Sequence, residues 1–399
     1  MNGSTSIAPD LIWTGDINRR PEVQDGFDRS RTVRFYDTTL RDGEQAVGVV
    51  FSADAKYQIA RALDELGVGR IESGFPRVSD EDTQAVRRIL DAGLHSEIWG
   101  FARAVKADID AHIELGTRAV LIEIATSEQK MQAYGFTRET VINRMSDAIR
   151  HARAHDMRVN FFPVDATRSD LDFLEQVYKA AIAAGASEVS VVDTIGACAP
   201  EAVEFLIRKV ASWVGPRVPI HWHGHNDFGL ATAAAVAAVR GGATWIHGTI
   251  NGMGERAGNA DICEVALALQ CLYNVPVEMD LSKARKVSEL VRAAGDYQVD
   301  RWKPVVGEAL FVRESGAVAA QFHMPDAIEP YSSSIVAARR GIVLGKKSGL
   351  ANIEIKIKEL GLVVPEEKFP TLLAQVKEQA TRTHQLVSDA DFVAMASAV

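Results

Sequence analysis

Short apolar segments alternate with longer amphipathic segments along most of the chain. From Thr32 onward, a β-branched or aromatic run is followed by a loop and then by an amphipathic stretch that usually closes at a glycine. This pattern repeats eight times. The predicted strands lie at residues 33–36, 70–72, 98–101, 120–122, 159–162, 189–192, 219–222 and 245–248. Amphipathic helices are predicted between them.

Capping residues mark the ends of these helices. Serines that precede acidic residues are predicted N-caps, at Ser52, Ser79 and Ser169. Glycines are predicted left-handed C-caps, at Gly67, Gly93, Gly116, Gly185 and Gly241. Eight strands alternating with eight helices over about 245 residues predict a (β/α)8 TIM barrel at residues 31–275. The structural alternative is a doubly wound open sheet, which usually has fewer units, and no GxGxxG follows a strand.

The repeat stops after residue 275. Residues 276–399 are predicted to form a smaller, mostly helical C-terminal region, with helices at 281–294, near Leu350 and at 369–381. Residues 1–30 lack the apolar centre of a signal peptide, so we expect a flexible N-terminal arm.

Composition excludes several classes of protein. The 399 residues are 47% hydrophobic and 24% charged, as in globular proteins, and the net charge of -9 with scattered basic residues argues against a nucleic-acid partner. No apolar stretch is long enough to span a membrane. The three cysteines are an odd number without a disulfide spacing, which fits a reducing compartment. We therefore expect a cytoplasmic protein.

A barrel of this kind carries its active site in the loops that follow the strands. Polar residues follow seven of the eight predicted strands, among them Arg41, Asp42, Gln45, Glu72, Glu123, Ser127, Asp165, Asp193, Thr194, His223, His225 and Asn259. Taken singly, each is as well explained by a helix cap or a surface ion pair. Their convergence on one face predicts a single site.

His223 and His225 are the strongest candidates for metal binding. Residues two apart in an extended chain point to the same face, so the two imidazoles would lie side by side where the seventh strand ends. A polar strand end without a metal gives the same spacing. The pair alone therefore leaves both interpretations open.

Four longer motifs resemble one enzyme family. The stretches FYDTTLRDGEQ, VDTIG, HGHNDFGLATA and NGMGERAGN are similar to those of the homocitrate and isopropylmalate synthases, in the group that includes 3-hydroxy-3-methylglutaryl-CoA lyase. The similarity runs from about Val33 to Leu269 and resumes at residues 306–307 and 343–346. The resemblance implies an acyltransferase that condenses acetyl-CoA, or another acyl-CoA, with a small 2-oxo acid. It also implies a homodimer.

The resemblance implies a divalent metal, Mg, Mn, Co or Zn, held by Asp42, His223, His225 and Asn259. Expected catalytic residues are Arg41, Glu72, Asp165 and Thr194. Expected substrate-binding residues are Arg41, Gln45, Arg103, Lys130, Thr194 and Arg313. Gly254, Arg256 and Gly258 are expected to bind coenzyme A at a helix N-terminus, although a tight turn explains these glycines equally well.

The chain departs from the family pattern at several positions. Val164 stands where the synthases carry a glutamate, Lys130 where a histidine is common, and Arg313 where a catalytic histidine is expected. Because these changes are apolar or cationic, we expect a more anionic substrate than the leucine-pathway synthases use. The alternative is that the cations lie on the rim, paired with Glu128 and Glu314.

Two other functions stay open at this point. A lyase or aldolase of the same group would cleave or form a carbon-carbon bond at a similar ketone, but the loop at residues 252–259 lacks the cysteine of the lyases. A noncatalytic, ligand-binding barrel is the third possibility. Cys263 and Cys271 are predicted core residues, and Cys198 is predicted to be inert.

Overall fold

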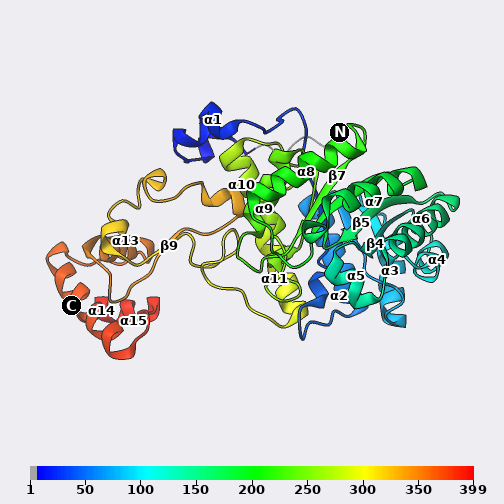
Figure 1. The fold of residues 1–399 in the computed structure, drawn as a ribbon. Helices are drawn as coiled ribbons and strands as arrows, with labels where there is room; N and C mark the ends of the chain where they lie inside the picture. Colours follow the sequence, from blue (N-terminus) through cyan, green and yellow to red (C-terminus); the bar gives the residue numbers. More distant parts are fainter. Residues whose placement is uncertain (1–6) are drawn as a thin grey trace. The chain divides into compact units, whose positions relative to one another are not determined.

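The structure, a computed structural model, describes residues 7–399 and separates them into two compact units (Figure 1). The first unit contains Gly15–Val299, and the second contains Ile7–Thr14 and Asp300–Val399. Part of the predicted N-terminal arm, residues 1–6, lies outside the described residues. The domain boundary predicted at residue 275 stays a prediction, and the first compact unit continues beyond it to Val299.

Eight parallel strands close into a barrel in the order β1 to β8, which confirms the predicted TIM barrel and excludes the open sheet (Figure 1). The strands are β1 (Arg34–Asp37), β2 (Arg70–Glu72), β3 (Glu97–Arg103), β4 (Ala119–Ala125), β5 (Arg158–Val164), β6 (Glu188–Asp193), β7 (Ile220–Gly224) and β8 (Trp245–Gly248). The barrel closes where β1 pairs with β8, with Tyr36 opposite His247.

Helices alternate with these strands along the chain. They are α2 (Ala53–Leu66), α3 (Asp80–Leu90), α4 (Lys106–Glu114), α5 (Glu128–Tyr134), α6 (Arg138–Ala154), α7 (Leu171–Ala184), α8 (Pro200–Val214), α9 (Ala231–Gly241) and α10 (Ile262–Tyr273), with α1 (Pro21–Gln24) before the barrel and α11 (Ala284–Gly295) after it. The N-caps predicted at Ser52 and Ser79 are confirmed, since each hydroxyl accepts a hydrogen bond from the first turn of its helix.

Two predicted caps are wrong by one residue. Asp170 rather than Ser169 caps α7, because its carboxylate accepts the Phe173 N–H at 2.9 Å. Gly241 ends α9 from within the helix, and the left-handed residue is Gly242, with φ of 113°. Both helices still lie within a residue of their predicted positions, and the ends differ because helix ends are less sharply specified than helix faces.

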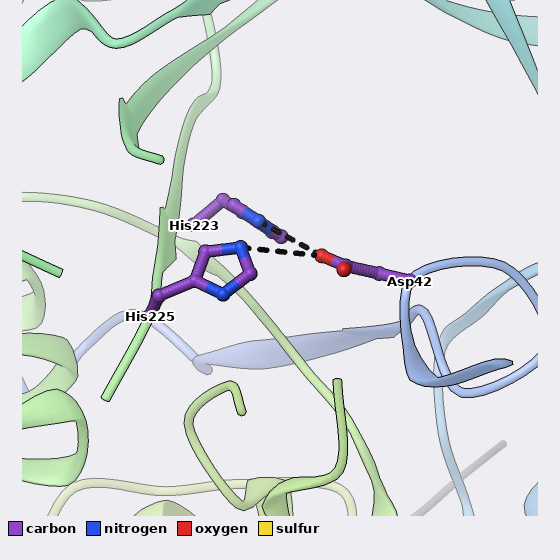
Figure 2. A group of neighbouring side chains, drawn as sticks. All are labelled: Asp42, His223 and His225. Carbon is purple, nitrogen blue, oxygen red and sulfur yellow. Dashed lines mark ion pairs between the residues drawn. The ribbon is translucent and has the colours of Figure 1, made fainter. Parts of the chain in front are cut away.

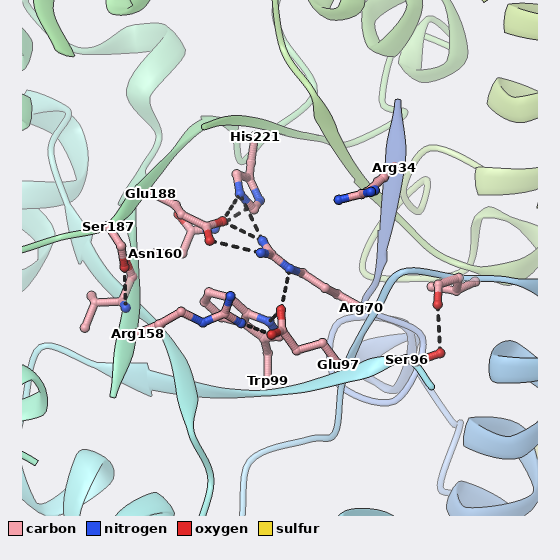
Figure 3. A network of polar contacts seen from close by, with 12 residues as sticks. Arg34, Arg70, Ser96, Glu97, Trp99, Arg158, Asn160, Ser187, Glu188 and His221 are labelled. Atoms are coloured by element: carbon pink, nitrogen blue, oxygen red, sulfur yellow. Dashed lines mark hydrogen bonds and ion pairs between the residues drawn. The ribbon is translucent and has the colours of Figure 1, made fainter. Parts of the chain in front are cut away.

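A largely buried ion network lies at the start of the strands (Figure 3). We define this base network as Arg70, Glu97, Glu188 and His221. The Arg70 guanidinium donates to Glu188 and to Glu97, each at 2.9 Å, and His221 Nε2 lies 2.6 Å from Glu188. Two tryptophan rings cover Arg70, at 4.5 and 3.7 Å. The network therefore fixes the relative positions of four strands.

The second unit has its own small core. Its helices are α12 (Gly316–Ala319), α13 (Leu350–Glu359), α14 (Phe369–Thr383) and α15 (Asp389–Ala398), with a two-stranded sheet of β9 (Val312–Arg313) and β10 (Gly341–Ile342). Leu344, Ile353, Leu372 and Phe392 pack together in its core. The helices predicted near Leu350 and at 369–381 are confirmed, whereas α15 was not predicted.

Candidate active site

Three potential metal ligands converge at the C-terminal ends of the strands (Figure 2). We define the metal-site triad as Asp42, which follows β1, His223 of β7, and His225 directly after β7. One ligand atom of each lies within 4.8 Å of the others, and all three residues are buried. Nε2 of His223 lies 3.2 Å from Asp42 Oδ2, and Nε2 of His225 lies 3.6 Å from the same oxygen.

The charge states of Asp42 and His225 suit a metal. Burial alone would raise the pKa of Asp42, but the Arg41 guanidinium and the two imidazoles outweigh it and hold this pKa below its ordinary value. Burial lowers the pKa of His225 to about 4, so its imidazole is neutral near pH 7. An ionised carboxylate and a neutral imidazole are the forms that bind metals.

Asn259 supplies a fourth candidate ligand beside the triad. An isolated bridge pairs its backbone with that of His225, and its amide nitrogen donates to the Met253 carbonyl at 3.1 Å. Its buried Oδ1 has no hydrogen-bond partner among residues 7–399. A carboxylate oxygen, two imidazole nitrogens and an amide oxygen fit Mg, Mn, Co or Zn with positions left for a substrate.

Arg41 and Glu72 form a buried ion pair beside the triad. Arg41 Nε donates to Glu72 Oε2 at 2.8 Å, and the guanidinium lies over the Phe101 ring at 4.3 Å. The Nη1 atom lies 3.6 Å from Asp42, whereas the buried Nη2 has no hydrogen-bond partner among the described residues. Arg41 can therefore offer a donor to a substrate oxygen next to the triad.

Two predicted catalytic residues form hydrogen bonds with other groups of the protein. The carboxylate of Asp165, at the end of β5, accepts from Ser127 at 2.5 Å and from Arg168 at 2.9 Å. Thr194 Oγ1 accepts from the Asp165 N–H at 2.8 Å. Through these bonds, both residues stabilise the loops that follow β5 and β6. Their catalytic roles stay predictions.

The predicted substrate-binding cations have varied surroundings. The Arg103 guanidinium donates two hydrogen bonds to the Asp108 carboxylate, at 2.7 and 3.0 Å. Lys130 is half-buried on α5. In the second unit, Arg313 lies 3.6 Å from Glu329 and donates to the Leu310 carbonyl. Gln45 is exposed in the loop after β1. The substrate roles of all four stay predictions.

The predicted rim pairs do not form among residues 7–399. Glu128 accepts from Gln132, and Glu314 accepts from the backbone N–H of Lys347. The partner of Arg313 is Glu329 instead.

The glycine loop, residues 252–259, is a tightly folded turn. Gly258 has φ of +83°, and a Cβ there would lie 2.0 Å from the Gly252 carbonyl oxygen. Arg256 donates to Asp227 at 2.9 Å and to the Thr194 carbonyl at 2.8 Å. The close approach of the backbone therefore explains Gly258, while coenzyme A binding by Gly254, Arg256 and Gly258 stays a prediction.

The role of one acid in the barrel was not indicated by the sequence. Glu123 of β4 is partly buried, and burial raises its pKa to about 7. In the sequence it appeared only as one of many polar residues near a strand end. The feature of the sequence that could have indicated a role is a single acid inside the apolar run AVLIEIA. Burial also raises the pKa of Cys198, to about 12, which fits the prediction that this thiol is inert.

The fold and the site define the class, a (β/α)8 barrel protein with a candidate divalent metal centre at the C-terminal face. No helix among residues 7–399 is long and apolar enough to cross a membrane. The chain belongs to the HMGL-like family, whose model matches residues 32–291. This confirms the family resemblance of the sequence motifs.

Similar proteins include several synthases. The chain is 40% identical to a putative (R)-citramalate synthase of Archaeoglobus fulgidus, over 90% of this chain and 73% of the relative. It is 38% identical to a 2-isopropylmalate synthase of Saccharolobus solfataricus (92% and 96%) and to a homocitrate synthase of Methanothermobacter thermautotrophicus (87% and 88%). A solved hydroxymethylglutaryl-CoA lyase from Pseudomonas aeruginosa shares the fold, with a TM-score of 0.61 and 22% identity over 68% of this chain and 95% of that chain.

Proposed function

We propose that this protein is an acyltransferase that condenses acetyl-CoA, or another acyl-CoA, with a small 2-oxo acid in the presence of a divalent metal. The observation that carries the proposal is the metal-site triad beside Arg41, in a chain 38% to 40% identical to synthases over most of its length. Fold alone would not carry it, because TIM barrels host many unrelated reactions.

A bound divalent cation would act as a Lewis acid on the ketone of the 2-oxo acid. The triad and Asn259 would hold the cation. Arg41 orients the substrate through its free Nη2 and stabilises negative charge that develops on the ketone oxygen. Glu72 positions Arg41 through their 2.8 Å contact and keeps the guanidinium beside the triad.

A lyase or aldolase remains the alternative function, and the structure offers less for it. Its support is similarity in fold to hydroxymethylglutaryl-CoA lyases, at 16% to 22% identity. The glycine loop also carries no cysteine. We therefore favour a synthase over a lyase or aldolase as the function of this protein.

The experiment is a substrate screen with the purified protein. A panel of 2-oxo acids is offered together with acetyl-CoA and Mg, Mn, Co or Zn, and the free thiol of coenzyme A is measured. We expect thiol release that requires both a metal and one class of 2-oxo acid. Release of pyruvate, glyoxylate or acetoacetate from hydroxy acids or their CoA thioesters, without any synthesis, would favour the lyase.

A further inference from the structure

Glu123 points into the barrel at the level of the candidate active site. Paired residues of neighbouring parallel strands face the same side of a sheet, and Glu123 pairs with Phe162 on β5. The Phe162 ring packs against His223 and His247, at 5.1 and 6.2 Å between ring centroids, so Phe162 faces inward. Glu123 therefore faces inward as well.

Its height along the barrel is fixed by the neighbouring strand. On β3, Phe101 pairs with Leu121, and the Phe101 ring carries the Arg41 guanidinium at 4.3 Å. Glu123 lies two residues further along β4, on the same face and nearer the C-terminal end. Its carboxylate therefore lies near Arg41, and its neighbour on β5 is Phe162, whose ring packs against His223.

The Glu123 carboxylate has no partner of its own. No hydrogen bond or ion pair joins it to any residue from 7 to 399, although the side chain is largely withdrawn from solvent. The charged groups around it are Arg41 and Asp42 after β1, Glu72 of β2 and Arg103 of β3, while β5 contributes the apolar Phe162. Burial raises its pKa to about 7, the range of an effective general base at neutral pH.

The neighbouring acids Glu72 and Asp165 already form hydrogen bonds with other side chains. Glu72 holds Arg41 at 2.8 Å, and Asp165 holds Arg168 and Ser127. Val164, where the family pattern places a glutamate, leaves β5 without an acid at that level. Val164 pairs with Ala125 on β4, two residues beyond Glu123 on the same face. A carboxylate on β4 can thus reach the space that one on β5 would occupy.

We propose that Glu123 is the general base that removes a proton from the carbon next to the thioester carbonyl of acetyl-CoA, an assignment that rests on the proposed function. The carbon–hydrogen bond breaks, its electron pair forms the carbon-carbon double bond of the enolate, and the proton moves to a Glu123 carboxylate oxygen. The enolate carbon then adds to the ketone of the 2-oxo acid, the π electrons of the ketone move to its oxygen, and the proton held by Glu123 passes through water to that alkoxide. Water then hydrolyses the thioester, which yields the carboxylic acid and the free thiol of coenzyme A.

The test compares Glu123→Gln and Glu123→Asp with the wild type. We expect Glu123→Gln to lower kcat by about 10² to 10⁴-fold, the usual contribution of a general base, with less than about a threefold change in KM for the 2-oxo acid. Metal content and thermal unfolding should stay unchanged, and Glu123→Asp should restore part of kcat. The matched control is Glu128→Gln on the exposed side of α5, which should leave kcat unchanged.

Two further readouts separate a base from a structural residue. The wild type should exchange the methyl hydrogens of acetyl-CoA with deuterated water, and Glu123→Gln should not. The wild-type kcat should also fall as the pH drops below about 7, because a protonated carboxyl cannot accept the proton, and this limb should vanish in Glu123→Gln.

Three results would overturn the assignment. They are a Glu123→Gln enzyme with kcat within about threefold of the wild type, a change confined to KM, or undiminished deuterium exchange. A wild type that releases no thiol with any 2-oxo acid would instead contradict the proposed function, and this inference with it.

Discussion

At the scale of single residues, the close approach of two imidazoles and one carboxylate in the metal-site triad favours metal binding over other roles. His223→Ala removes one ligand atom of three that lie within 4.8 Å, so we expect bound metal to fall from about one ion per chain to almost none, with loss of activity. Metal content after dialysis, measured by mass spectrometry, checks this. The control is His95→Ala, which alters an exposed histidine outside the site.

Full metal content and turnover in His223→Ala would mean that the triad is a polar strand end and no metal site.

The residues of the site differ in how far the sequence could specify them. His223 and His225 were predictable from spacing, because alternation along a strand fixes the face to which a side chain points. Asp42 depended on the family resemblance, since its loop conformation has no such period. Glu123 was placed in the predicted site but was given no role, because one acid in an apolar strand is equally a buried structural residue until its neighbours are known.

The bonding partners of Asp165 depend on its backbone conformation. Asp165 has φ of +65°, in the left-handed region, and this turn allows its carboxylate to bond to Arg168 three residues later. Neither the conformation nor the partner follows from residue type, because Asp tolerates several backbone regions. Its bonding partners could therefore be found only in the structure.

At the scale of elements, the glycine loop should be intolerant of a side chain at Gly258. Gly258→Ala combines a left-handed φ with a Cβ 2.0 Å from the Gly252 carbonyl oxygen, so the loop must shift and carry Asn259 with it. We expect a loss of about 1–3 kcal/mol in the free energy of unfolding, together with weaker metal binding. Thermal unfolding and metal titration measure the two effects.

Gly93→Ala is the matched control, because Gly93 also has a left-handed φ, of +64°, but nothing lies within 4 Å of its Cβ position. It should cost only about 1 kcal/mol and leave metal binding unchanged. Equal effects of the two substitutions would contradict the role of the close backbone approach.

The base network predicts a stability that depends on pH. Burial alone would raise the pKa of Glu188, but His221 and Arg70 outweigh it and lower this pKa from 4.5 to about 2. Because the folded-state pKa lies below the unfolded one, the stabilisation is complete above about pH 4.5 and is lost as the pH falls toward 2. Urea unfolding of the wild type across this window should show the loss.

Glu188→Gln should flatten that pH dependence and lower the free energy of unfolding by about 3 kcal/mol at pH 7, because Arg70 loses a buried partner. Glu175→Gln breaks only an exposed pair with Lys179 and should cost under about 0.5 kcal/mol. Similar costs for both variants would argue against a stabilising role of the base network.

The elements themselves were largely predictable. All eight barrel strands lie where the apolar runs placed them, because a strand buried on both faces is a continuous apolar run. The ends were less certain. Ser169 and Asp170 both suit an N-cap, and only the bond from Phe173 distinguishes them. The sequence also did not reveal α15, whose apolar face lacks a strong helical period.

At the scale of the whole molecule, the family resemblance predicts a homodimer, with residues near Arg313 and Lys347 reaching the neighbouring subunit. Light scattering coupled to size exclusion should give twice the mass of 43.4 kDa. A fully active monomer at working concentration would remove this prediction.

The closed barrel follows from length, repeat number and alternation, which together leave few arrangements of eight strand-helix units. The identity of the 2-oxo acid does not follow in the same way, because it depends on the shape and charge of a cavity built from several loops. The expected preference for an anionic acid therefore stays a prediction. The fork of Arg103 onto Asp108 shows that one of the expected substrate-binding cations already has a protein partner.

The most direct test of the central claim measures thiol and product together. Metal-depleted protein is given acetyl-CoA labelled with ¹³C in the acetyl group, one 2-oxo acid at a time, and then a divalent metal. We expect free coenzyme A and a labelled hydroxy acid, larger than the 2-oxo acid by the acetyl carbons, in equal amounts and only after metal is added. Thiol release that is independent of both metal and 2-oxo acid, or the absence of any labelled hydroxy acid across the panel, would contradict it.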